Sequence, residues 1–356
     1  MSISNDGKRM RGNNERRIKR DKPYNKRKKQ VVSSEDILND QLEKIFDRVI
    51  LPDELVEIRY EVMKRVEHVL NLNYVDFMFK GQVYGSTHYG LCLKDGDLDI
   101  CCTSQSGRQV NPIVLESFAD CFKRKLCSKK IKINEIDKFE IKNVIETAKV
   151  PIIKMVDLET KVKIDLSFNQ PVAQIHSEFF YTMINCVKHF RIVAVLLKYW
   201  LKIRNLNCPF KGGLSSAALC FMICHYFTTF DPPLFPSDFR YYLVPPCELR
   251  ILGSKLPAQV TIQHTPASLV KGFFDYYKNF DFDYPIQPTL GELPENYFLV
   301  PAVMTVLDPI SLVNCTKGVS MDGLKAFKME LTRASKILNE ENDFNKLLEK
   351  PVPFPE

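Results

Sequence analysis

Long apolar runs are missing from this sequence, and so are the cysteine and histidine patterns that usually hold zinc. No stretch reaches about 18 consecutive apolar residues, so a membrane span is not expected. The first residues include Asp6 and lack an apolar signal core, so no secretory signal is expected. The 11 cysteines form no CxxC pair and no histidine cluster stands near them, which argues against a zinc site and favours a reducing compartment.

Positive charge is concentrated at the start of the chain. Residues 1–30 hold 12 lysines and arginines against 3 acidic residues, whereas the whole chain carries a net charge of only +7. Residues 1–32 are also poor in large apolar side chains, so a disordered basic tail is predicted. The run KRDKPYNKRKK is typical of a nuclear import signal or an RNA-attracting arm, with a solvated tail that has no specific partner as the alternative. The tail favours the nucleus, and the cytoplasm stays open.

Helical periodicity stands before and after a segment of mixed pattern. The apolar spacing predicts helices over residues 34–49 and 52–70. The second helix is expected to bury a stripe made of Leu55, Ile58, Val62, Val66 and Val69. Largely apolar core helices are predicted over residues 187–206 and 214–230, and an amphipathic helix over 321–342.

The mixed segment combines strands with a helix. Residues 74–80 are typical of a strand, 113–127 of a helix, and 150–168 of a β-hairpin that turns at 157–159. This pattern favours an α+β fold in which a sheet domain is inserted into a mainly helical domain, with a cleft between them. The expected boundaries are a basic tail over 1–32, helices of the helical domain over 33–73, the sheet domain over 74–180, the helical domain again over 181–350, and a tail over 351–356.

Two aspartates stand in an apolar stretch where their charges repel each other. Side chains two residues apart on a strand point the same way, so Asp97 and Asp99 project together while Leu98 and Ile100 face the other side. Like charges this close favour a bound cation, and a hard divalent ion such as Mg²⁺ suits oxygen ligands. Asp95 has the same parity but precedes Gly96, so we interpret it as a loop residue.

A third carboxylate occurs alone in a later apolar strand. Asp165 lies in the second half of the predicted hairpin, where an isolated acid is rarely present for stability. If its strand lies beside the strand of Asp97 and Asp99, three carboxylates converge as in a two-metal phosphoryl-transfer site. The turn Gly85-Ser86 stands shortly before them and could donate to a phosphate. The alternative is an ordinary turn followed by a solvated acidic strand end.

These motifs together resemble a known family. The stretch YGSTHYGLCLKDGDLDI resembles the signature of the DNA polymerase β-like nucleotidyltransferases. The later stretches follow in the order used by non-canonical poly(A) polymerases and terminal uridylyltransferases; they are VPIIKMVDLETKVKIDLSFN, LLKYWLKIRNLN, FKGGLSSAALCFM and LDPISLVNCTKGVS. The likeness covers about residues 50–340 and looks closest to the nuclear surveillance, TRAMP-type poly(A) polymerases. It implies a polymerase β-like sheet domain inserted into a helical, PAP-associated central domain.

The resemblance implies roles for the acidic residues and for the turn before them. In the family, the positions of Asp97 and Asp99 bind both metals, and that of Asp165 completes the metal that activates the RNA 3′-hydroxyl. Gly85 and Ser86 would hold the triphosphate. The expected cofactor is Mg²⁺ or Mn²⁺.

Further residues would bind the nucleotide. Lys198 and Lys202 lie one helical turn apart in an apolar helix, and the family uses the first position for the β- and γ-phosphates; the alternative is that both lysines reach outward from a core helix. Ser215 and Ser216 precede a helix and suit a triphosphate, although helix capping explains Ser215 equally well.

Two positions depart from the family pattern or bear on the choice of base. The family commonly has a base-stacking tyrosine where this chain has Ala217. The resemblance implies that the loop with Asp308 and Asn314 binds the nucleotide. Uridylyl-specific members often carry a histidine at the position of Asn314. Adenylyl-transferring relatives carry an asparagine there, as this chain does. The histidines, such as His88, His176 and His225, are isolated, so packing or surface roles are expected for them.

The sequence therefore predicts a template-independent RNA 3′-nucleotidyltransferase that uses ATP. RNA 3′ ends and ATP are the expected substrates, and RNA-binding or helicase proteins are possible partners because no separate RNA-recognition motif is visible. A terminal uridylyltransferase of the same fold, a non-catalytic RNA-processing scaffold, and nucleotide transfer to a small molecule or protein are the alternatives.

Overall fold

The computed structural model describes residues 33–108, 110, 114–123, 138–146, 150–234, 264–288, 302–311 and 313–349. Contacts group Ser34–Glu356 into one compact unit. Its buried apolar side chains form two clusters, which we name the sheet cluster and the helical cluster. The tails predicted over 1–32 and 351–356, and most of the proline-rich loops between Pro232 and Pro257, lie outside the described residues.

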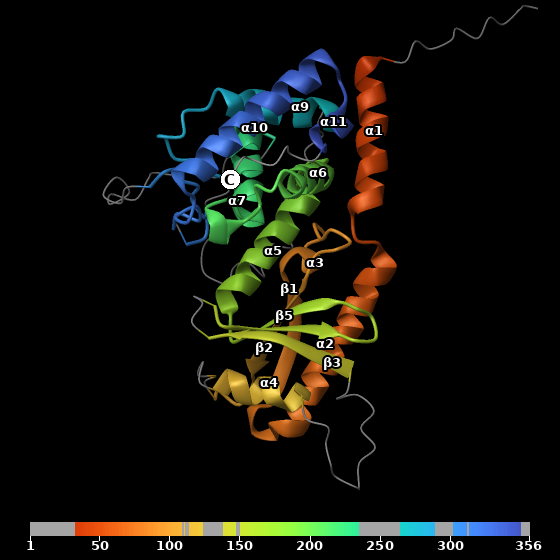
Figure 1. Cartoon of the computed structure of the whole chain (residues 1–356), viewed down its shortest axis with the longest axis vertical. Helices are drawn as coiled ribbons and strands as arrows, with labels where there is room; N and C mark the ends of the chain where they lie inside the picture. The colour runs from red at the N-terminus through yellow and green to blue at the C-terminus, as the bar shows by residue number, and fades with distance from the viewer. Residues whose placement is uncertain are drawn as a thin grey trace, which may run out of the picture. The chain divides into compact units, whose positions relative to one another are not determined.

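A five-stranded sheet forms one half of the unit (Figure 1). Its strands are β1 (Phe79–Tyr84), β2 (Leu98–Ser104), β3 (Phe139–Ile145), β4 (Ile152–Asp157) and β5 (Lys163–Phe168), in the order β1-β2-β5-β4-β3. Strands β4 and β5 are antiparallel, which confirms the predicted hairpin. Strands β2 and β5 are parallel neighbours although they are distant in sequence. This pairing brings the two acidic segments of the chain together.

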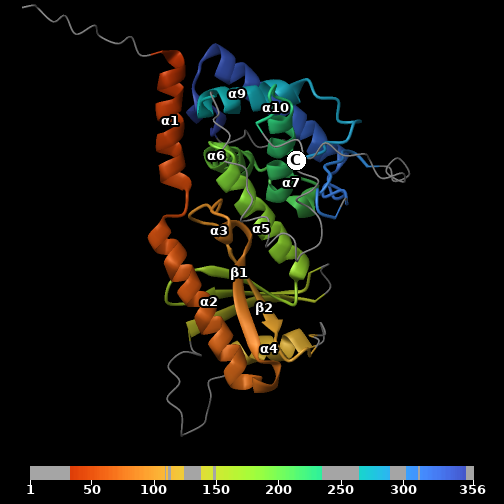
Figure 2. The same cartoon turned by 180° about the vertical axis from the view of Figure 1, so that it is seen from behind.

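Two helices cover the sheet, α2 (Asp53–Asn73) and α4 (Leu115–Lys123), and Figures 1 and 2 show both beside it. Two local predictions are wrong here. Leu55 and Ile58 are 41% and 38% exposed, because they line an open hollow beside the β4–β5 turn instead of the sheet cluster. The strand predicted from residue 74 begins only at Phe79, because a 3₁₀ turn, η1 (Val75–Phe77), precedes it.

The helical cluster joins segments from both ends of the unit. Its helices are α1 (Ser34–Val49), α5 (Pro171–Cys186), α6 (Phe190–Ile203), α7 (Ser216–Thr228), α9 (Pro266–Lys278), α10 (Met321–Glu340) and α11 (Phe344–Leu347). Helix α1 packs on α6 and α9, whereas α2 buries Val62, Val66 and Val69 in the sheet cluster. The predicted core residue Trp200 is fully buried. Among the described residues, no helix is long and apolar enough to span a membrane.

Candidate active site

Four polar side chains form a row across neighbouring strands of the sheet. Tyr84 of β1 is opposite Asp99 of β2, Asp99 is opposite Asp165 of β5, and Asp165 is opposite Lys154 of β4. Directly opposed residues of paired strands share one face, so these side chains lie on the same side of the sheet. Asp97 stands two residues before Asp99 and shares its parity. The strand of Asp165 therefore lies beside the strand of Asp99, as predicted, and Asp97 lies just before the start of β2. We call Tyr84, Asp97, Asp99, Asp165 and Lys154 together the acidic row.

The acidic side chains of this row affect one another electrostatically. Burial, together with the negative charge of Asp165, raises the pKa of Asp99 to about 7, although the positive charge of Lys198 partly opposes the shift. Burial and Asp165 also raise the pKa of Asp97 above its ordinary value. A nearby cation would make the ionised forms of these carboxyl groups more favourable. The row is therefore suited to bind positive charge.

Lys154 already supplies positive charge to one member of the row. Its Nζ donates to Asp165 Oδ1 at 2.8 Å and to Oδ2 at 2.6 Å, so both oxygens of this carboxylate are engaged. We did not predict this contact from the sequence. The signal was a lone lysine inside the apolar strand of β4, which has the same form as the lone Asp165 in β5.

The side chains of the acidic row are compared with the ligands that a divalent ion needs by their donor atoms and their arrangement. Among the described residues, no three His, Cys, Asp or Glu side chains are already arranged to hold one ion. The donor set is nevertheless suitable, because carboxylate oxygens are the ligands that Mg²⁺ and Mn²⁺ prefer. Both oxygens of Asp165 are in contact with Lys154. Asp97 and Asp99 carry no such ion pair among the described residues.

A buried arginine holds the loop that carries the first aspartate. Arg59 of α2 is only 4% exposed and donates to the carbonyl oxygens of Gly96 and Asp97, at 2.5 and 3.0 Å. The same guanidinium donates to Thr87 Oγ1 at 2.9 Å, and Thr87 follows the Gly85-Ser86 turn. Arg59 therefore connects the turn with the Asp97 loop. The sequence did not reveal this role, because a charged residue in a helix usually reads as part of its exposed face.

The predicted phosphate turn lies directly against the acidic row. Gly85 begins the short helix α3 (Gly85–His88) with φ +67°, and its N–H donates to Ser177 Oγ at 2.8 Å. A Cβ atom at this position would overlap Asp99 Oδ2, so only glycine fits. Ser86 is the next residue of the same turn. A triphosphate role for Gly85 and Ser86 stays a prediction.

The two lysines predicted to bind phosphate occupy different surroundings on α6. Lys198 Nζ donates to the Leu91 carbonyl at 3.1 Å, and burial lowers its pKa. Its charge acts on Asp99, which places it close to the acidic row. Lys202 instead forms an ion pair with Asp95, the predicted loop residue. Burial would raise the pKa of Asp95, but the hydrogen bond and charge of Lys202 outweigh it and lower that pKa.

Ser215 and Ser216 stand at the start of α7. Ser215 is its N-cap and accepts a hydrogen bond from the Ala218 N–H at 3.1 Å, so the capping role that the sequence left open is present. Ser216 Oγ accepts from Asn207 Nδ2 at 3.4 Å. Ser215 therefore caps α7, and phosphate binding by Ser215 and Ser216 stays a prediction.

The loop expected to read the base is held together by its own side chains. Asp308 is buried, and its carboxylate pairs with His176 at 2.7 Å and accepts from Ser311 Oγ. Burial would raise the pKa of Asp308, but these hydrogen bonds lower it. Asn314 donates to the Met304 carbonyl and accepts from the Thr316 N–H at 2.8 Å. Neither side chain is free in this state, so their predicted contacts with a nucleotide would require local rearrangement.

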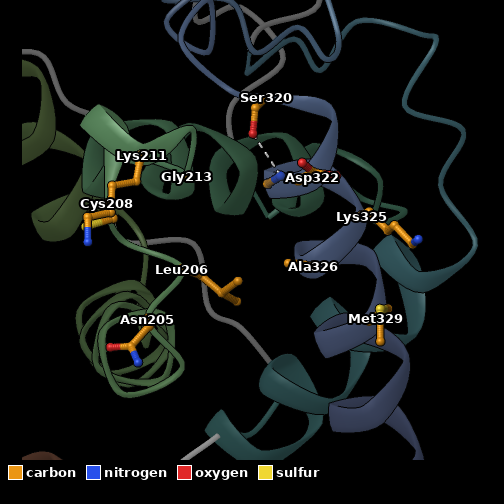
Figure 3. Close-up of a pocket in the computed structure, with 11 residues that line it drawn as sticks. Asn205, Leu206, Cys208, Lys211, Gly213, Ser320, Asp322, Lys325, Ala326 and Met329 are labelled. Atoms are coloured by element: carbon orange, nitrogen blue, oxygen red, sulfur yellow. Dashed lines mark hydrogen bonds between the residues drawn. The ribbon is translucent and has the colours of Figure 1, made fainter. Parts of the chain in front are cut away.

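A large hollow of about 910 Å³ lies in the helical half, away from the acidic row. Figure 3 shows the 205–213 loop facing the first turns of α10 across this hollow, with Lys211 and Lys325 at its sides. No member of the acidic row lines it. Its size therefore does not make it the reaction site, because the perturbed carboxylates lie elsewhere.

The fold is similar to that of known nucleotidyltransferases. Residues 38–185 match the family described as "Poly(A) RNA polymerase, mitochondrial-like, central palm domain". A solved structure of the Cid1 poly(U) polymerase with Mg 3′-dATP bound has a TM-score of 0.71 at 21% identity, covering 88% of this chain and 99% of that one. This likeness confirms the predicted α+β fold.

Curated relatives match parts of the sequence. Poly(A) RNA polymerase cid13 of Schizosaccharomyces pombe is 29% identical over 203 residues, which is 57% of this chain and 33% of cid13. Terminal uridylyltransferase cid1 of the same organism is 24% identical over 315 residues, covering 76% of this chain and 72% of cid1. The chain thus spans about a third of the first relative. Over these stretches the chain is similar to poly(A) RNA polymerases and to a terminal uridylyltransferase. Its predicted place beside the TRAMP-type group stays a prediction.

Proposed function

We propose that this chain is a template-independent RNA 3′-nucleotidyltransferase that depends on a divalent ion. The carrying observation is that Asp99 and Asp165 are directly opposed on parallel strands, with Asp97 two residues away. A purely structural role would not bring three carboxylates into one row, because their mutual repulsion costs stability. The relatives named poly(A) polymerase and uridylyltransferase support the same reaction class.

The residues of this chain would divide the work as follows. Asp97, Asp99 and Asp165 would hold Mg²⁺ or Mn²⁺. Such an ion, when bound, lowers the pKa of the RNA 3′-hydroxyl and offsets negative charge on the triphosphate. Lys198 would add positive charge beside Asp99, and the Gly85-Ser86 turn would orient the phosphates. No histidine is needed as a base.

We further propose ATP as the preferred nucleotide, with AMP added to the RNA end. The support is Asn314, which stands where uridylyl-specific relatives often carry histidine. The second candidate is uridylyl transfer from UTP, favoured by the cid1 match, which covers more of this chain than the cid13 match does.

Extension of one labelled RNA primer with each of the four NTPs tests the proposal. With Mn²⁺ or Mg²⁺ we expect extension that is strongest with ATP and absent in Asp99→Ala. Preference for UTP would replace the nucleotide assignment and keep the reaction. No extension by the folded wild-type protein with any NTP would favour the non-catalytic scaffold.

The remaining assignments are proposals about the whole protein. We propose a nuclear location on the basis of the basic run at 19–29, and RNA-binding or helicase proteins as partners that select the RNA. We also propose that the sheet half and the helical half act as the two domains of the enzyme, as the two hydrophobic clusters suggest.

A further inference from the structure

Among the described residues, Lys154 and Asp165 form the one ion pair within the acidic row. They are directly opposed on the antiparallel strands β4 and β5, so the backbone itself keeps the two side chains adjacent. Their side chains are 38% and 21% exposed, and two hydrogen bonds join them. The pair is therefore a fixed feature of the sheet, unlike most ion pairs at a protein surface.

The position of Lys154 matters because a divalent ion needs the same oxygens. Asp165 is the third carboxylate of the row, and both of its oxygens accept from Lys154. A carboxylate has lone pairs for more than one partner, but two cations at the same group repel each other. Lys163 and Lys198 also act on the row, yet neither forms an ion pair with Asp97, Asp99 or Asp165 among the described residues.

We propose that Lys154 is the resident counterion of Asp165 and that it competes with the divalent ion for this carboxylate. Lys154 relieves the repulsion within the row while no ion is bound, and it releases at least one Asp165 oxygen when an ion binds. It is a positioning residue, because it acts through Asp165. The inference rests on the proposed function, since it assumes that the row binds the ion.

The test measures Mn²⁺ binding to the full chain without nucleotide or RNA, by the loss of the electron paramagnetic resonance signal of free Mn²⁺. Lys154→Met should bind Mn²⁺ about tenfold more tightly than wild type, because a like charge has left the site. Lys154→Arg keeps the positive charge, and its guanidinium can form two hydrogen bonds with the Asp165 carboxylate. This variant should therefore bind Mn²⁺ no more tightly than wild type. Lys163→Met is the matched control for losing a nearby lysine, and its affinity should change less than that of Lys154→Met.

Thermal unfolding supplies a second readout. In EDTA, Lys154→Met should unfold at a lower temperature than wild type, and Mn²⁺ should raise its unfolding temperature by more than it raises that of wild type. If Lys154→Met binds Mn²⁺ no more tightly than wild type or Lys163→Met, the competition is overturned. Asp99→Asn tests whether the acidic row binds the ion at all. If wild type and Asp99→Asn bind Mn²⁺ equally, the acidic row is not the ion site, and the proposed function fails together with this inference.

Discussion

At the scale of single residues, the ionised form of Asp99 is disfavoured by burial and by the charge of Asp165. The pKa of Asp99 is raised to about 7, so the folded protein holds a proton that the unfolded chain releases near pH 4. Without a bound metal, stability should therefore fall as the pH rises from about 4 to about 7, because the folded state binds more protons than the unfolded state in that window.

The replacement Asp99→Asn should consequently stabilise the metal-free protein at pH 8 while abolishing RNA extension. Removing an unfavourable buried charge should raise the free energy of unfolding by about 2 kcal/mol at pH 8, and by less at pH 5. Urea unfolding in EDTA at the two pH values measures this. Asp283→Asn, at an exposed position, is the control and should change little. A loss of stability at pH 8 would show that the surroundings of Asp99 stabilise its ionised carboxylate instead of destabilising it.

Gly85 offers a test of how tightly the turn and the acidic row fit together. Gly85→Ala combines a left-handed backbone with overlap against Asp99, so it should lower the free energy of unfolding by about 2–3 kcal/mol and strongly reduce extension. Gly107→Ala meets the same kind of backbone at φ +76° but no atom within 4 Å. It should cost only about 1 kcal/mol and leave extension unchanged. Equal effects of the two variants would contradict the steric coupling.

At the scale of elements, the start of α7 separates capping from phosphate binding. Ser215→Ala removes the N-cap and should lower the free energy of unfolding by about 1 kcal/mol. Ser216→Ala leaves the cap in place and should change stability little, while raising the KM for the nucleotide if Ser216 contacts phosphate. Chemical unfolding and steady-state extension kinetics give both values. A stability loss in Ser216→Ala as large as in Ser215→Ala would contradict this division.

Much of the sheet could be predicted from the sequence because alternation is a strong local signal. Parity placed Asp97 with Asp99, and the β-branched runs placed Asp165 in a hairpin. What could not be predicted depends on distant partners. Leu55 and Ile58 have good helical spacing, but the sheet does not cover that turn of α2, so they stay exposed.

The polar contacts around the site show the same limit. Arg59 is buried because Gly96, Asp97 and Thr87 offer it acceptors, and none of these is near it in sequence. Lys154 contacts Asp165 only through the pairing of β4 with β5. Similarly, His176 and Asp308 meet only once α5 and the 302–311 loop have packed.

At the scale of the whole molecule, charge is divided between the basic tail and a nearly neutral remainder. Deleting residues 1–32 should weaken RNA binding and reduce its dependence on salt, because fewer counterions are released from the phosphates. Extension at saturating primer should stay close to that of the full chain. Titrations of a labelled RNA at several salt concentrations measure the slope. An unchanged slope would mean that the tail does not contact RNA.

Because β2 and β5 are neighbours in the sheet but distant in sequence, β2 leaves the ribosome well before its partner β5. A nascent chain that has emerged only as far as Ser104 can pair β1 with β2, yet it presents Asp97 and Asp99 with no strand on their other side. The centre is completed when the hairpin of β4 and β5 arrives and inserts next to β2. Because Lys154 is part of that same hairpin, the third carboxylate emerges together with its own counterion. The growing polypeptide therefore never exposes the full set of negative charges without the cation that balances part of it.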